Sequence, residues 1–167
     1  MSPGPLIVQS DRTVLLETGH PNASDARHEL AIFAELERAP EHIHTYRITR
    51  LGLWNARAAG HDANFIIDSL TRWSKFELPS SVVGEIRSAI DRFGKLVISR
   101  DNSGLVLVSE SPAVLAEVSS NKKVAELLEA KIESGYRIQP WARGQLKQQL
   151  LTLGWPAINE KFDFRRY

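Results

Sequence analysis

The stretch from residue 80 to residue 108 changes its hydrophobic period once, and this change constrains the fold more than any other feature. Apolar residues first recur at helical spacing, at Val82, Val83, Ile86, Ile90 and Phe93, and Gly94 follows as a C-cap. Two β-rich runs, residues 95–99 and 105–108, come next and enclose the turn sequence Asp101-Asn102-Ser103-Gly104. The sequence therefore predicts a helix that leads directly into a β-hairpin.

Two further short helices are expected before this point. Thr49 can N-cap a helix that Gly60 ends, and His61-Asp62 begins a second helix that is broken at Leu78-Pro79. Three short helices followed by a two-stranded hairpin is the order of elements in a winged helix. We therefore expect residues 51–156 to form a helix-rich, winged-helix-like domain with a short β-hairpin.

The first fifty residues have a different pattern. Residues 6–8 and 13–16 are β-rich runs on either side of a turn, which is typical of a hairpin. A helix is expected from about residue 23 to residue 39, where Pro40 stops it, and residues 42–48 indicate a third strand. These segments predict a small β-β-α-β lobe over residues 5–50, so the whole chain is expected to be of the α+β class.

The last third of the chain is expected to alternate short helices with one strand. Ser111-Pro112 is a favourable helix start, because serine caps and proline suits the first turn. The expected elements are helices at 112–118, 121–133 and 142–153, and a strand at 135–140. Residues 157–167 have mixed charge and are expected to be a tail or linker.

The composition excludes several classes of protein. Of the 167 residues 43% are apolar and 25% are charged, which is ordinary for a globular protein. Cysteine is absent, which removes disulfides and thiolate metal sites. No apolar run approaches the roughly 20 residues that span a bilayer, and residues 1–5 lack the features of a signal peptide. We therefore expect a cytoplasmic protein that makes no contact with a membrane.

Motifs that carry catalysis are also missing. Neither the phosphate-binding pattern G-x-x-x-x-G-K-[ST] nor G-x-G-x-x-G after a strand is present, and there is no H-E-x-x-H. His42 and His44 share one face of a strand but lack a third ligand on that face, so two ordinary polar residues are the favoured interpretation. The sequence predicts no ATPase, metal, cofactor or covalent-catalysis site in this chain.

Binding of nucleic acid is the function that the basic residues could support. The net charge is only +1, so any contact with DNA needs a local patch. If the chain contains a winged helix, the helix over 80–94 is its recognition helix and the hairpin its wing. The candidate DNA contacts are then Arg72, Lys75, Arg87, Arg92, Arg100 and Asn102. The alternative is that these residues form an ordinary solvated face or a surface for protein contacts. The four tryptophans are spaced like core or interface anchors rather than like a ladder for stacking bases.

Three long stretches carry a resemblance to a known family. Residues 4–11, 33–46 and 51–62 read GPLIVQSD, FAELERAPEHIHTY and LGLWNARAAGHD. Further markers are the Leu78-Pro79 break and the segments 91–94, 107–112 and 153–157. With these stretches the chain resembles the N-terminal, pre-motor region of bacterial XPB-type DNA repair helicases, over nearly its whole length.

The resemblance implies a role in an ATP-dependent 3′–5′ DNA helicase that is linked to nucleotide excision repair. In that family the ATP site lies in two RecA-like motor domains further along the chain, and none of their motifs occurs here. The resemblance therefore implies a non-catalytic accessory domain that helps engage DNA next to the motor, with weak and sequence-independent binding. Alternatives are a module that docks the motor domains, a partner subunit or a nuclease, and a free-standing winged-helix regulator. The ending, residues 159–167, departs from the linker expected ahead of a motor domain.

Overall fold

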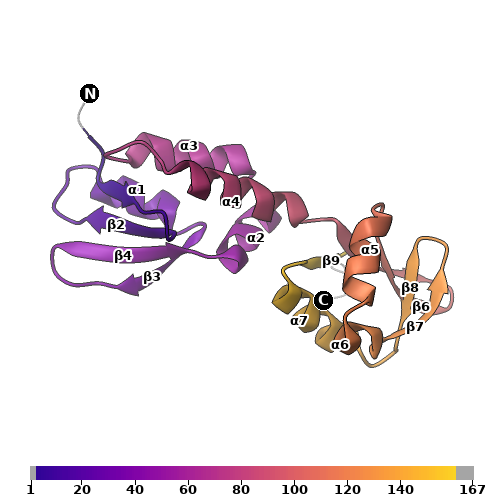
Figure 1. Cartoon of the computed structure of the whole chain (residues 1–167). Coiled ribbons are helices and arrows are strands. Elements are labelled where there is room, and N and C mark those ends of the chain that lie inside the picture. Colours follow the sequence, from indigo (N-terminus) through magenta and orange to yellow (C-terminus); the bar gives the residue numbers. More distant parts are fainter. Residues whose placement is uncertain (1–2, 161–167) are drawn as a thin grey trace. The chain divides into compact units, whose positions relative to one another are not determined.

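The chain divides into two compact units, with the boundary between Ile90 and Asp91. A computed structural model describes residues 3–160, and Figure 1 shows both units. Each unit has its own β-sheet and its own hydrophobic cluster, and the described residues contain two sheets and seven helices. The expected mixture of helices and strands is therefore confirmed.

The sheet of the first unit has four antiparallel strands in the order β1-β2-β4-β3. Its strands are β1 (Leu6–Val8), β2 (Thr13–Glu17), β3 (Ala34–Arg38) and β4 (Ile43–Ile48). The hairpin expected over residues 6–16 is present, with Ile7 opposite Leu15. The strand expected at residues 42–48 is β4, which occupies the centre of the sheet beside β2.

Four helices accompany this sheet. They are α1 (Ala23–Leu30), α2 (Arg50–Ala58), α3 (Ala63–Trp73) and α4 (Ser80–Arg92). The predicted N-cap at Thr49 is confirmed, because its side chain accepts from the backbone N–H of Gly52. Asp62, expected at the start of the next helix, accepts from the backbone N–H of Phe65. The helix α2 lies close to the chain before β3. A Cβ on Gly52 would stand 2.5 Å from the carbonyl oxygen of Phe33, so only glycine fits there.

The helix expected over residues 23–39 is wrong beyond Leu30. The chain turns at Ala31–Phe33, and residues 34–38 form β3, which pairs with β4 with Ala34 opposite Ile48. The ring of Phe33 is fully buried in the turn. The sequence AELER has good helix formers, but pairing with β4 overrides this weak local preference.

The expected domain boundary near residue 50 also differs from the structure. One hydrophobic cluster joins Ile48 of the sheet to Ile66 of α3 and Ile86 of α4, so residues on both sides of residue 50 share a core. The lobe expected over 5–50 therefore has no core of its own, and the domain expected over 51–156 is divided after Ile90.

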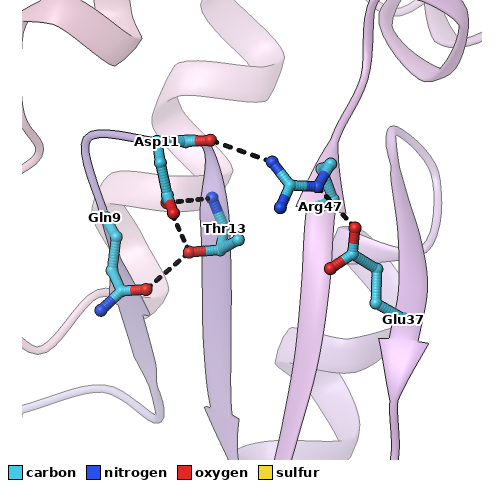
Figure 2. A network of polar contacts seen from close by, with 5 residues as sticks. All are labelled: Gln9, Asp11, Thr13, Glu37 and Arg47. Carbon is cyan, nitrogen blue, oxygen red and sulfur yellow. Dashed lines mark hydrogen bonds and ion pairs between the residues drawn. The ribbon is translucent and has the colours of Figure 1, made fainter.

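Polar contacts fix the turn between β1 and β2 and connect it to β3 (Figure 2). The hydroxyl oxygen of Thr13 lies 2.6 Å from Asp11 Oδ1 and 2.5 Å from Gln9 Oε1, and its single proton is donated to one of them at a time. The hydrogen bonds from Thr13 lower the pKa of Asp11. The guanidinium of Arg47 donates to the carbonyl of Asp11 and, at 2.5 Å, to Glu37 on β3.

The sheet of the second unit has five strands in the order β7-β8-β6-β5-β9. They are β5 (Leu96–Asp101), β6 (Gly104–Val108), β7 (Leu128–Ile132), β8 (Gly135–Ile138) and β9 (Ala157–Asn159). Its helices are α5 (Pro112–Ser119), α6 (Lys122–Ala125) and α7 (Arg143–Leu153). The core contains Ile98 and Leu107 of the sheet together with Val118 of α5 and Leu146 of α7.

The predicted hairpin β5–β6 is present, but the winged-helix arrangement is not confirmed. The hairpin pairs with β8 on one side and with β9 on the other, so it is the middle of a sheet rather than a free wing. The N-cap at Ser111 is as expected. The helix α7 ends at Gly154, which adopts a left-handed C-cap conformation with φ of 86°.

Two other expectations for the second unit are wrong. The helix expected at residues 121–133 ends at Ala125, because Leu128 pairs with Ile138 and begins β7. The expected tail contributes a strand, since Ala157–Asn159 lies parallel to β5 with Ala157 opposite Leu96. The rest of that segment, residues 161–167, lies outside the described residues.

Candidate nucleic-acid interface

The six predicted DNA contacts are divided between the two units. Arg72, Lys75 and Arg87 lie in the first unit, and Arg92, Arg100 and Asn102 lie in the second. They therefore do not form one cluster within a single unit. Their individual surroundings decide which of them are available to a ligand.

Arg72 belongs to a cluster around the carboxylate of Glu29 on α1. Its Nη1 atom lies 2.9 Å from Glu29 Oε1, and the same carboxylate accepts from the hydroxyl of Ser69 at 2.7 Å and from the indole N–H of Trp73 at 2.6 Å. Burial raises the pKa of Glu29, but hydrogen bonds from Ser69 and Trp73, followed by the charge of Arg72, leave it below the ordinary value. The cluster connects α1 to α3, and Arg72 stabilises that connection.

The other two candidates of the first unit are also engaged. The ammonium of Lys75 pairs with Glu17 of β2, and the backbone N–H of Lys75 donates to the carbonyl of Leu6 at 2.7 Å. Arg87 donates to the amide oxygen of Asn64 at 3.1 Å. The three cations of this unit therefore hold neighbouring elements together.

Arg92 anchors the end of α4 within the second unit. Its guanidinium donates to the carbonyl of Gly154 at 2.9 Å and lies over the ring of Trp155, 4.4 Å from the ring centroid. The indole N–H of Trp155 donates to Glu117 at 2.6 Å. Arg92 thus fixes the segment that leads into β9.

Arg100 and Asn102 are the exposed candidates without a described partner, whereas Arg72 and Arg87 are exposed but hydrogen-bonded within the chain. Arg100 lies near the end of β5, opposite Leu105, and Asn102 lies in the turn that follows. Neither makes a side-chain hydrogen bond or ion pair with any residue in the described range 3–160. The turn is tight, with Gly104 in the left-handed region at φ of 129°. These two side chains are therefore free to contact a ligand.

The end of β8 lies at the same end of the sheet as this turn. The strand β8 runs antiparallel to β6, with Val106 opposite Arg137, so Ile138 is next to the start of β6. Trp141 follows three residues later and is 62% exposed. We call Arg100, Asn102 and Trp141 together the tip surface.

A salt bridge holds the hairpin turn at the tip surface. The guanidinium of Arg137 donates to both carboxylate oxygens of Asp101, at 3.1 Å and 2.9 Å. Asp101 also accepts from the backbone N–H of Ser103 at 2.8 Å. The hydrogen bonds from Arg137, followed by that from Ser103, lower the pKa of Asp101 to about 2. The negative charge of Asp101 is thereby neutralised beside Arg100.

Sequence reasoning missed this pair and the Glu29 cluster. Asp101 and Arg137 are 36 residues apart in sequence, and Glu29 and Trp73 are 44 apart. The short strand expected at 135–140 was the one signal that could have brought Arg137 to the hairpin, once its pairing with β6 was considered. No comparable signal relates α1 to α3.

Within residues 3–160 no three His, Cys, Asp or Glu side chains are placed to hold a metal ion. In the same range there is no helix with the length and apolar character needed to cross a bilayer.

Several known proteins are similar to this chain in sequence. The family described as helicase conserved C-terminal domain matches residues 6–133. A DNA 3′-5′ helicase XPB of Kineococcus radiotolerans is 52% identical over 159 residues, which cover 94% of this chain and 28% of that protein. The protein of the same name from Mycobacterium tuberculosis is also 52% identical, with 94% of this chain and 29% of that protein covered.

A more distant relative is the general transcription and DNA repair factor IIH helicase/translocase subunit XPB/SSL2 of Saccharomyces cerevisiae. It is 30% identical over 92% of this chain and 18% of its own length. The chain therefore spans less than a third of the length of these relatives. They confirm the resemblance to XPB-type helicases. The placement ahead of the motor is not confirmed, because the matched description names a C-terminal domain.

The Glu29 cluster generates a prediction for stability. Replacing Glu29 by alanine should lower the free energy of unfolding by about 1–3 kcal/mol, because the indole N–H of Trp73 and the hydroxyl of Ser69 lose their acceptor. Urea unfolding followed by tryptophan fluorescence measures this change. The matched control is Glu77→Ala, which removes an exposed carboxylate and should have little effect. Equal effects of the two substitutions would contradict the role of the cluster.

The Asp101–Arg137 pair generates a prediction for pH dependence. The pKa of Asp101 is lower in the folded chain than in the unfolded chain, so its contribution to stability is complete above about pH 4 and is lost as the pH falls through about 2. The substitution Arg137→Ala should raise the pKa of Asp101 toward its ordinary value and reduce this loss. Carbon-13 NMR of the Asp101 carboxyl group measures the titration. An unchanged midpoint would show that Arg137 is not its cause, and Arg38→Ala serves as the control.

Proposed function

Because the chain belongs to the family of the helicase conserved C-terminal domain, we propose that it is a non-catalytic accessory region of an XPB-type DNA helicase. In this proposal it lies ahead of the motor domains and helps the longer protein to engage DNA during nucleotide excision repair. The observation that carries the proposal is the 52% identity, over 94% of the chain, to proteins named DNA 3′-5′ helicase XPB. ATP hydrolysis would belong to motor domains elsewhere in the longer protein.

The tip surface is the part of the chain that we assign to DNA contact. Arg100 can pair with a phosphate, and the amide of Asn102 can donate to phosphate or sugar oxygens, because both side chains are exposed without a described partner. Both contacts are independent of base sequence. The backbone of Leu127 accepts a hydrogen bond from Gln139, two residues before Trp141, so the preceding residue, Glu126, is near this end of the sheet. The carboxylate of Glu126 would repel phosphate. Glu129 also lies close enough to Arg137 to raise its pKa, so few cations and more than one carboxylate are the reasons to expect weak binding.

The proposal predicts a salt-dependent effect of Arg100. The substitution Arg100→Ala should weaken binding to duplex DNA about equally for all sequences, and it should reduce the slope of log affinity against log salt concentration by about 1. Fluorescence anisotropy with labelled duplexes across a salt series measures both quantities. The control is Arg38→Ala, which removes an exposed arginine of β3 and should leave the slope unchanged. Absence of DNA binding even at low salt would contradict the proposal.

A second candidate function is a protein-interaction module, and one feature of the first unit favours it. Leu36 of β3 is 52% exposed and Leu51 of α2 is 49% exposed, on two elements that pack against each other. Two large apolar side chains on neighbouring elements suit a protein contact, for example with the motor domains or with a partner subunit or nuclease.

This second function predicts loss of a complex rather than loss of DNA binding. The double substitution Leu36→Ser and Leu51→Ser should weaken co-purification with separately expressed motor domains of an XPB-type helicase, since the apolar contact is removed. The control is Phe76→Ser, at an apolar position in the segment before α4 that is even more exposed, at 65%. If the double variant and the Phe76→Ser control both co-purify with the motor domains as well as the unchanged chain does, Leu36 and Leu51 do not form the docking surface.

A further inference from the structure

Trp141 differs from the other tryptophans in its surroundings. The indole N–H groups of Trp54, Trp73 and Trp155 donate to acceptors within the chain, at 2.8 Å, 2.6 Å and 2.6 Å. Trp141 is 62% exposed, and its ring makes no hydrogen bond or ring contact with the described residues. Three tryptophans therefore stabilise the fold, whereas Trp141 presents its ring to solvent.

The position of Trp141 is fixed by the backbone on both sides. Before it, the N–H of Gln139 donates to the carbonyl of Leu127 at 3.0 Å, which continues the pairing of β8 with β7. After it, the N–H of Ala142 donates to the carbonyl of Gln139 at 2.9 Å, and Ala142 is fully buried where α7 begins. The ring is thus presented from an anchored turn rather than from a loose loop.

The neighbours of Trp141 on the tip surface favour a nucleic acid. Arg100 and the end of β8 are separated by the strand β6, and two strand spacings amount to about 10 Å. An aromatic ring at the same end of a sheet as a guanidinium and an amide is a combination that can hold a single strand, since bases stack on the ring while phosphates contact the cation. A purely apolar protein contact would not use Arg100 or Asn102.

We propose that Trp141 stacks on an unpaired base of DNA, while Arg100 and Asn102 contact the backbone of the same strand. This inference rests on the proposed DNA-engaging function and specifies the form of DNA that the tip surface takes. A base inside a duplex is covered by its neighbours on both faces, and exposing it requires unstacking and unpairing. The second unit therefore prefers DNA with unpaired bases, such as a gap or a fork, over a fully paired duplex.

The test compares a labelled duplex that contains a short gap of unpaired thymines with a fully paired duplex of the same sequence. Fluorescence anisotropy with the whole 167-residue chain should show tighter binding to the gapped DNA. The substitution Trp141→Ala should reduce affinity for the gapped DNA by about fivefold to a hundredfold, and affinity for the paired duplex by less than about twofold. Trp141→Phe should restore most of the preference, because phenylalanine also offers a ring for stacking.

A spectroscopic measurement separates stacking from other effects of Trp141. With 2-aminopurine in the gap, binding of the unchanged chain should quench the fluorescence of that base, and Trp141→Ala should abolish the quenching. The matched control is Phe76→Ala, which removes an aromatic ring of similar exposure, 65%, from the first unit and should change neither affinity nor quenching.

The possible outcomes distinguish this inference from the function on which it rests. Equal affinity for gapped and paired DNA, unchanged by Trp141→Ala, would overturn the stacking of a base and leave the DNA-engaging function in place. No binding to either DNA at low salt would overturn both. If Trp141→Ala weakened a complex with motor domains and left gapped-DNA affinity unchanged, Trp141 would be a protein contact and the inference would be wrong.

Discussion

The carboxylate of Glu29 is the interaction on which the first unit most depends. It accepts from Ser69 and Trp73 of α3 and pairs with Arg72, so one side chain of α1 fixes the position of a second helix. After α3 the chain passes beside β1, where the backbone N–H of Lys75 donates to the carbonyl of Leu6. A carboxylate with several donors is stable when mostly buried because its charge is compensated. The same compensation makes Arg72 part of the connection between α1 and α3.

Local signals in the sequence predicted the elements that local chemistry determines. The caps at Thr49, Asp62 and Ser111 and the hairpin turn ending at Gly104 all require only neighbouring residues. The failures are the strands β3 and β7, with sequences AELER and LEAKI, whose residues favour helices. Their strand conformation results from pairing with β4 and β8, and that pairing is a property of the tertiary fold.

The sequence predicted which residue types could contact DNA, but not which of those side chains are free of partners within the chain. Six residues able to contact phosphate were visible in the sequence, and four of them donate to internal partners that lie far away along the chain. The partner of Lys75 is 58 residues distant and that of Arg92 is 62 residues distant. Arg100 and Asn102 remain because neither side chain has a partner among the described residues. The sequence favoured core or interface anchors for all four tryptophans, and Trp155 fits this interpretation because it donates to Glu117 and packs against Arg92.

The salt bridge between Asp101 and Arg137 affects how fast the tip surface can bind a ligand. Asp101 holds the N–H of Ser103 and the guanidinium of Arg137, so the backbone that carries Arg100 and Asn102 is ordered before a ligand arrives. A pre-organised surface loses little conformational entropy on binding and needs no slow rearrangement. With so few contacts, release is also rapid. Such a surface suits repeated, brief contacts with a ligand.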